Sequence, residues 1–146
     1  MQRFSALGFF VLVSLAACSR ATVGRAAPTN RSVIQYDSLV AVREPGPHNG
    51  GGETTAYSFF TREERLALVF RKRALHPGAA IGYHQNDVDE IYYVLSGRGE
   101  LTLNGVRQLV GPGTAILTRA DSFHGLRQVG AEDLVIIINY PRGREG

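Results

Sequence analysis

The chain has 146 residues, a formal net charge of +3 and 44% hydrophobic residues. This length allows one domain with a substantial core, and the ordinary apolar and charged content argues against a disordered chain. The arginines are scattered among acidic residues rather than gathered in a stripe, so we expect no nucleic-acid surface. The 17 glycines favour short strands joined by tight turns.

The first residues have the features of a targeting signal. Arg3 precedes an apolar run over residues 4–15, which is too short to span a bilayer comfortably. The run ends in Leu15-Ala16-Ala17-Cys18, which resembles the lipobox of bacterial lipoproteins, where cleavage precedes a cysteine that becomes lipidated. Ser19 in the next position resembles the outer-membrane type. Ordinary secretion, with no role for Cys18, is the alternative.

This resemblance implies a lipoprotein on the periplasmic side of the bacterial cell envelope, attached to the membrane through a lipid on Cys18. Residues 1–17 would then be a signal peptide, and 18–31, rich in Ala, Arg and Thr, would be a tether. We expect one domain over 32–141 and a polar tail over 142–146. Cys18 is the only cysteine, so the domain depends on its core rather than on disulfides.

The domain shows no long helical period, and turn signals recur at short intervals, as in all-β sandwiches and barrels. Asn104-Gly105 is the strongest hairpin signal among them. The last strand is apolar on both faces, so we expect it to be buried on both sides, within a double-sheet core or at a subunit contact. The expected strands are an edge strand over 33–42, then 54–60, 66–75, 91–95, 100–103, 106–110, 114–118, 124–129 and 134–140.

The residues that can carry chemistry gather between positions 84 and 124. In an extended strand residues two apart share a face, so His84 and Asn86 should point the same way. Glu90 opens the next strand, and His124 follows a Gly-Pro-Gly turn and a further strand. These nitrogen and oxygen donors suit a metal site built from strands.

The spacing of these residues resembles the first motif of the cupin superfamily, which are small jelly-roll barrels, also described as double-stranded β-helices. That motif is a Gly, five residues, His-x-His, three or four residues, Glu, six residues and a Gly. Gly78, His84, Asn86, Glu90 and Gly97 stand at those spacings. Asn86 is a departure, because it replaces the second His.

The second cupin motif is matched more loosely. The segment 111–114 (Gly-Pro-Gly-Thr), the strand 115–118 and His124 follow its order and roughly its length, but 119–122 (Arg-Ala-Asp-Ser) replaces the later Pro-x-Gly. The resemblance covers about residues 66 to 140. Superfamily members frequently form dimers, and the apolar last strand is compatible with a homodimer.

The resemblance implies that His84, Asn86, Glu90 and His124 hold one divalent metal ion, which could be Fe, Mn, Ni or Zn. An amide oxygen is generally a weaker ligand than imidazole for such metals, so Asn86 or a water could fill its position. Glu90 could instead act as a catalytic proton-transfer base. The alternative is that these residues line a hydrated barrel mouth or bind a ligand directly, without metal.

Other residues could line the same interior. Tyr92 should share a face with Glu90, as a pocket residue or as a plain core aromatic. Arg71 and Arg73 share a face of their strand, for which we expect an outward, solvated orientation. Turned inward, Arg71 could pair with a substrate carboxylate or phosphate. His48 lies in a Gly-rich loop and is expected to be solvated, with a lid over the barrel mouth as the alternative.

The sequence therefore predicts an envelope-anchored, single-domain cupin that handles a small organic molecule inside the barrel. A metal-dependent oxygenase or isomerase is the expected function. A non-catalytic module that binds a sugar-like or other small molecule without metal is the alternative, and a purely structural barrel is a third reading. Fold alone does not choose between them.

Overall fold

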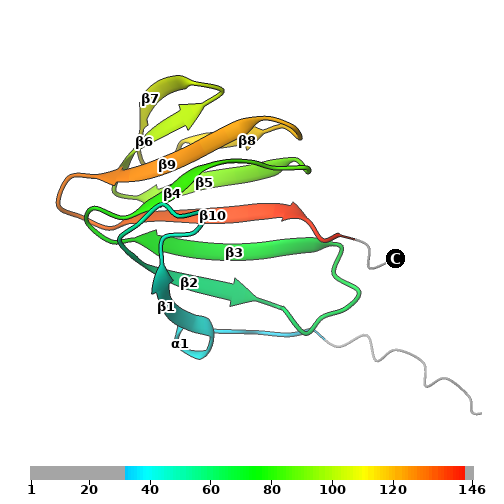
Figure 1. Ribbon diagram of the computed structural model, residues 1–146. Helices are drawn as coiled ribbons and strands as arrows, with labels where there is room; N and C mark the ends of the chain where they lie inside the picture. The colour runs from blue at the N-terminus through cyan, green and yellow to red at the C-terminus, as the bar shows by residue number, and fades with distance from the viewer. Residues whose placement is uncertain (1–31, 144–146) are drawn as a thin grey trace, which may run out of the picture. The chain divides into compact units, whose positions relative to one another are not determined.

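The computed structural model describes residues 32–143, and the expected signal peptide, tether and lipidated Cys18 lie outside them. These residues form ten strands and one short helix (Figure 1). The elements are α1 (Asp37–Val40), β1 (Ala41–Pro45), β2 (Glu53–Phe59), β3 (Leu68–Leu75), β4 (Ala80–Gln85), β5 (Glu90–Ser96), β6 (Arg98–Leu103), β7 (Val106–Val110), β8 (Ala115–Thr118), β9 (Phe123–Val129) and β10 (Leu134–Pro141).

The strands make two antiparallel sheets that form the two layers visible in Figure 1. The larger sheet has the order β1-β2-β3-β10-β5-β8, and the smaller has the order β4-β9-β6-β7. Strands far apart in sequence are neighbours, since β10 pairs with both β3 and β5. This all-β jelly-roll arrangement confirms the predicted fold class.

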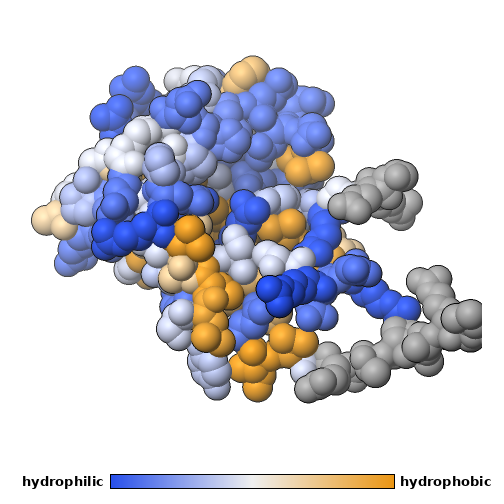
Figure 2. All heavy atoms as spheres, turned by 60° about the horizontal axis from the view of Figure 1, so that its bottom comes forward, coloured by the Kyte–Doolittle hydropathy of each residue, from blue (hydrophilic) through white to orange (hydrophobic). Residues whose placement is uncertain are grey.

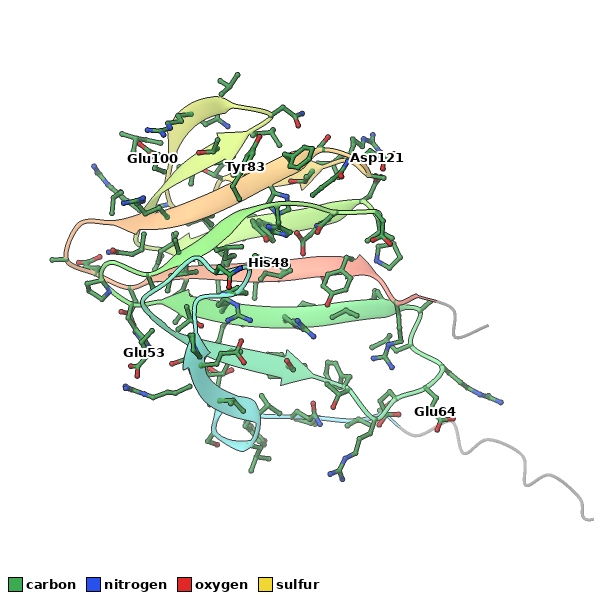
Figure 3. The ribbon with its side chains drawn as sticks, viewed as in Figure 1. His48, Glu53, Glu64, Tyr83, Glu100 and Asp121 are labelled. Carbon is green, nitrogen blue, oxygen red and sulfur yellow. The ribbon has the colours of Figure 1, made fainter. Side chains whose placement is uncertain are left out.

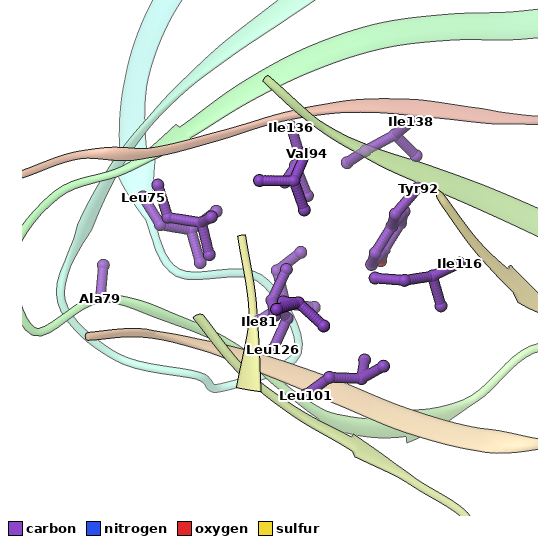
Figure 4. Close-up of a cluster of buried hydrophobic side chains, with 12 residues drawn as sticks. Leu75, Ala79, Ile81, Tyr92, Val94, Leu101, Ile116, Leu126, Ile136 and Ile138 are labelled. Atoms are coloured by element: carbon purple, nitrogen blue, oxygen red, sulfur yellow. The ribbon is translucent and has the colours of Figure 1, made fainter. Parts of the chain in front are cut away.

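The hydrophobic core lies between the two sheets (Figure 4). The larger sheet contributes Val94 and Ile136, and the smaller sheet contributes Leu101 and Leu126, each at most 1% exposed. Both sheets therefore present one apolar face inward, as expected for a sandwich that closes into a barrel.

Strand β10 is buried on its inner face only. Ile136 and Ile138 are 0% and 5% exposed, whereas Val135 and Ile137 between them are half-buried. The prediction of burial on both faces was therefore wrong for the outer face. Each outward residue of β10 is still flanked by β3 and β5, because the strand is interior to its sheet.

The start of the domain also differs from the prediction. One turn of helix, α1, precedes β1, which begins only at Ala41, so no strand runs through 33–42. Asp37 opens the helix and pairs with Lys72 of β3, which holds the turn against the sheet. Figure 2 turns this lower edge forward and shows apolar side chains gathered on it; exposed apolar residues of α1 and β1 include Leu39 and Val42.

Candidate metal centre and ligand pocket

A pocket of about 330 Å³ opens between the two sheets. Strands β3, β4, β5 and β10 and the 46–52 loop between β1 and β2 all contribute to its walls. Its lining residues are Pro47, His48, Arg71, Arg73, Ile81, His84, Asn86, Asp87, Val88, Glu90, Tyr92, Ile138 and Tyr140.

Three of the predicted donors meet at this pocket. The donor atoms of His84, Glu90 and His124 all lie within 4.8 Å of one another. Strand pairing brings them together, because β4 and β9 run side by side with His84 opposite His124. Glu90 reaches them from the first position of β5 in the facing sheet.

A β-bulge directs His84 into the pocket. Ile81 faces the core, and strict alternation along β4 would send His84, three residues later, to the outer face. The register of β4 against β9 shifts between Ile81 and His84, so both side chains face inward while Tyr83 points out and is 53% exposed. Bulges commonly re-aim a side chain beside a functional site.

Hydrogen bonds keep Glu90 ionised although it is only 7% exposed. Burial alone would raise its pKa, but hydrogen bonds from His124, Tyr92 and Asn86 outweigh that effect and leave the pKa below its ordinary value. The Nε2 of His124 lies 3.0 Å from Oε2 of Glu90, and the Asn86 amide donates to the same oxygen at 2.8 Å. The site therefore presents a carboxylate rather than a carboxylic acid.

The imidazole of His84 is held in the tautomer that a metal needs. Its Nδ1 lies 2.8 Å from the carbonyl oxygen of Gly82, which can only accept, so Nδ1 carries the proton and Nε2 keeps its lone pair. Two imidazoles and one carboxylate are an established ligand set for divalent first-row metals. The residues therefore fit a metal ion with three protein ligands, His84, Glu90 and His124, provided that Nε2 of His124 releases the proton that it shares with Glu90.

Asn86 lies at the site and also contacts another donor of the centre. It follows the last residue of β4, and its amide nitrogen donates to Glu90. The side chain thus orients the carboxylate, and only its oxygen remains as a metal donor. Sequence spacing could place Asn86 at the site but could not show this contact.

Tyr92 combines the two alternatives considered for it. Its ring is 3% exposed and belongs to the core, while its hydroxyl lies 3.1 Å from Nε2 of His124. Burial, followed by the nearby negative charge of Glu90, raises the pKa of Tyr92 well above its ordinary value. The hydroxyl therefore stays protonated and can donate a hydrogen bond at the centre.

The two arginines face the pocket, so the expected outward orientation was wrong. Arg71 pairs across the sheet with Ile138, which pairs with Tyr92, and all three line the pocket. Arg73 is 5% exposed; its guanidinium contacts Glu44 at 2.7 Å and the hydroxyl of Thr54 at 2.7 Å. Leu75 is two residues after Arg73 and four after Arg71, so all three lie on the same face of β3, and Leu75 faces inward. Its apolar side chain is the sequence signal that could have predicted the inward orientation of the arginines.

Arg71 differs from Arg73 in having no counter-charge. Its Nε is buried without a hydrogen-bond partner, and no carboxylate in the described part of the chain lies within 4.0 Å of its guanidinium. The guanidinium carbon lies 5.7 Å from the ring centroid of Tyr140. The pocket thus offers one unneutralised positive charge beside a three-ligand centre.

His48 is an exposed loop residue, as expected, but its ring also contacts the site. Its ring stacks on that of His84 with 3.5 Å between centroids and 6° between planes. Burial and, next, the neighbouring His84 lower the pKa of His48. In Figure 3 the labelled side chain lies beside β4, on the side that faces the larger sheet.

Residues 72–140 match the family model of the cupin domain, Cupin_2. The barrel has the cupin fold. The match falls within the stretch where the sequence resembles the superfamily, and it confirms that resemblance.

The chain is also similar to individual known proteins in sequence or in fold. The chain is 27% identical over 105 residues to an oxalate-binding protein of Thermotoga maritima, covering 70% of this chain and 87% of that protein. A predicted oxalate decarboxylase of the same organism has a TM-score of 0.69 at 24% identity, covering 75% of this chain and 98% of that one. The polyketide cyclase RemF of Streptomyces resistomycificus has a TM-score of 0.65 at 24% identity, covering 80% and 83%. The two structural likenesses concern the cupin fold alone.

Proposed function

We propose that the protein is a metal-dependent cupin enzyme that acts on a small organic acid inside the barrel. The observation that carries this proposal is the pocket itself, which is lined by His84, Glu90 and the unneutralised guanidinium of Arg71. His124 is buried directly behind it, with its donor atom within 4.8 Å of those of His84 and Glu90. A carboxylate would supply the missing negative charge and can accept a bidentate hydrogen bond from an arginine. The oxalate-binding relative supports a small carboxylate as the ligand class.

Each residue would have a separate task. His84, Glu90 and His124 would hold the ion, which as a Lewis acid would polarise an oxygen of the bound molecule. Arg71 would bind and orient the carboxylate. Asn86 and Tyr92 would keep Glu90 ionised and correctly turned. Oxygenase and isomerase reactions are the two classes that we propose, as both require a small molecule fixed beside such a centre.

Metal binding is tested first. The purified protein is stripped with chelator and reloaded separately with Fe(II), Mn(II), Ni(II) or Zn(II), and its metal content is measured by mass spectrometry. We expect about one ion per chain, because a single three-ligand centre is present. Glu90→Ala should lose the ion, and a wild-type protein that retains none of the four would refute the metal-dependent function.

The ligand class is tested by calorimetry with malonate and its neutral analogue malonamide. Malonate should bind wild type and bind Arg71→Met at least about tenfold more weakly, because a hydrogen-bonded charge is lost. The exposed Arg98, outside the pocket, provides the control Arg98→Met. Equal binding of malonamide, or unchanged malonate binding by Arg71→Met, would contradict the acid as ligand. Oxygen uptake and product analysis over the acids that bind then separate the two reaction classes.

A non-catalytic, metal-free binding module is the second candidate. It is favoured by the contacts of Glu90 with His124 and Asn86, since these contacts satisfy the buried carboxylate without an ion. Ligand-induced thermal stabilisation that persists in excess chelator, without turnover, would support this second function over the first.

We also propose that the protein works at the bacterial cell envelope, anchored through Cys18 at the outer membrane. The support is the lipobox-like sequence alone, because Cys18 lies outside the described residues. Between residues 32 and 143, no helix is long and apolar enough to cross a membrane. Membrane fractionation of wild type against Cys18→Ala tests the anchor. The homodimer stays a prediction, and light scattering of the purified protein measures it.

A further inference from the structure

The 46–52 loop lies directly against the bulge in β4. The backbone N–H of Gly82, within the bulge, donates to the carbonyl oxygen of Pro47 at 3.0 Å. The N–H of Ala80 donates to Gly51 at 3.1 Å. Strand β4 is at the edge of the smaller sheet, so the loop satisfies backbone donors on the side of β4 that β9 does not cover, and the two segments fix each other.

Glycines make this close approach possible. A Cβ at Gly82 would lie 1.9 Å from the carbonyl oxygen of His48, and one at Gly50 would lie 2.0 Å from that of Ala80. Neither space accepts any side chain, because a carbon atom cannot approach backbone oxygen so closely. The pairing of loop and bulge is thus specified by residues that have no side chain.

The loop holds His48 in an unusual backbone conformation. His48 and Asn49 have φ values of 53° and 58°, in the left-handed region that residues with a Cβ adopt uncommonly. Such conformations persist where surrounding contacts impose them, and they concentrate at functional sites. Here the imposed conformation delivers the His48 ring onto the face of His84.

The stacked geometry indicates support rather than metal ligation by His48. The nitrogen lone pairs of an imidazole lie in the ring plane, so two parallel rings 3.5 Å apart do not aim their lone pairs at one point. His48 is also absent from the group whose donor atoms lie within 4.8 Å of one another. His84 is instead held in its plane by the Gly82 carbonyl and across its face by His48.

We propose that His48 is a positioning residue that holds the imidazole of His84 in the orientation needed to bind a metal ion. The 46–52 loop and the glycines beside it are the device that places His48. This inference rests on the proposed metal centre, and it adds to that centre a residue from a loop distant in sequence. It predicts that the aromatic ring of His48 matters and its nitrogen atoms do not.

The variants His48→Ala and His48→Phe separate these two properties, because phenylalanine keeps a stacking ring without nitrogen. In calorimetry with Zn(II), His48→Ala should bind the ion about 10–100-fold more weakly than wild type, which is the usual effect of losing a contact that orients a metal ligand. His48→Phe should bind the ion within about threefold of the wild-type affinity. Unchanged affinity in His48→Ala would overturn the inference. Equal weakening in both variants would also overturn it, because a nitrogen would then be required.

A measurement on metal-free protein distinguishes this inference from the proposed function. Relaxation of the His84 ring carbons by NMR should report a restricted ring in wild type and His48→Phe, and added motion in His48→Ala. This result would stand even if wild type bound no metal, in which case only the proposed function fails. Identical His84 ring motion in all three proteins would refute the positioning role.

Gly82→Ala tests the loop without changing any side chain of the site. The added Cβ should displace the loop from β4 and weaken Zn(II) binding as His48→Ala does. Gly111→Ala is the control, since Gly111 lies outside this loop, has no positive φ, and a Cβ there meets only one atom, at 3.9 Å. Circular dichroism confirms that both variants fold. Wild-type affinity in a folded Gly82→Ala would contradict the proposed device.

Discussion

The inner and outer faces of β10 should differ sharply in their contribution to stability. Ile136 is 0% exposed and lies between Arg73 of β3 and Val94 of β5 in the register. Ile137 is the next residue and points to the half-buried outer face. Ile136→Ala and Ile137→Ala therefore remove the same three carbon atoms from opposite sides of one strand.

The expected cost follows from burial. Removing three buried carbons from Ile136 costs about 2.4 kcal/mol in transfer free energy, at roughly 0.8 kcal/mol each. Because strands on both sides limit collapse, a cavity adds to this, and we expect about 3–4 kcal/mol in total. Ile137→Ala should cost about 1 kcal/mol, because part of its side chain already contacts water.

Urea denaturation followed by circular dichroism measures both values. The midpoint for Ile136→Ala should fall by roughly 1–3 M urea with an unchanged slope, and that for Ile137→Ala should fall much less. Equal losses, or a larger loss for Ile137→Ala, would mean that the outer face of β10 is covered. The assignment of one inner and one outer face would then be wrong.

Three further predictions concern the site and its surroundings. His84→Ala should weaken Zn(II) binding, measured by calorimetry, by more than the roughly 10–100-fold that is typical when a residue contacting a metal ligand is lost. An affinity equal to that of wild type would show that His84 is not a ligand. Glu44→Gln should destabilise the fold by about 1–3 kcal/mol, because it leaves the buried Arg73 without its charged partner. The exposed-pair control Glu53→Gln should cost less than about 1 kcal/mol in the same urea assay, and equal costs would contradict the role of burial. A hydrogen bond from the Ala120 backbone, then one from Arg119, holds the pKa of Asp89 below 3.8, so its stabilisation is present above that pH and disappears as pH falls through the folded pKa. The melting temperature of Asp89→Asn should therefore be lower than that of wild type at pH 7, and the difference should vanish in acid; a constant difference would refute the linkage.

Most strand positions and the main donors were predictable because they depend on local patterns, although the expected strands did not include β4. The alternation of apolar residues and the Asn104-Gly105 turn predicted β6 and β7, and β7 begins and ends where expected. The fixed spacing of His84 and Glu90 indicated the metal centre. Alternation failed at 33–42, where Asp37 opens a helical turn that the contact with Lys72 stabilises.

The orientation of the arginines depended on partners distant in the chain. The two positive charges on one face of β3 predicted that this face is exposed to solvent, since burying a charge without a partner is costly. Glu44 and Thr54, from another part of the sequence, satisfy Arg73 and make its burial tolerable. No pattern within β3 contains that information.

The sequence by itself determined an all-β chain and the types of donor available to a metal, because strand periodicity and side-chain chemistry are local properties. Only the tertiary structure decided which faces turn inward, through the bulge before His84, and which loop supplies His48. Both depend on backbone contacts between segments more than 30 residues apart, such as that between Pro47 and Gly82. Such contacts exist only once the sheets have closed.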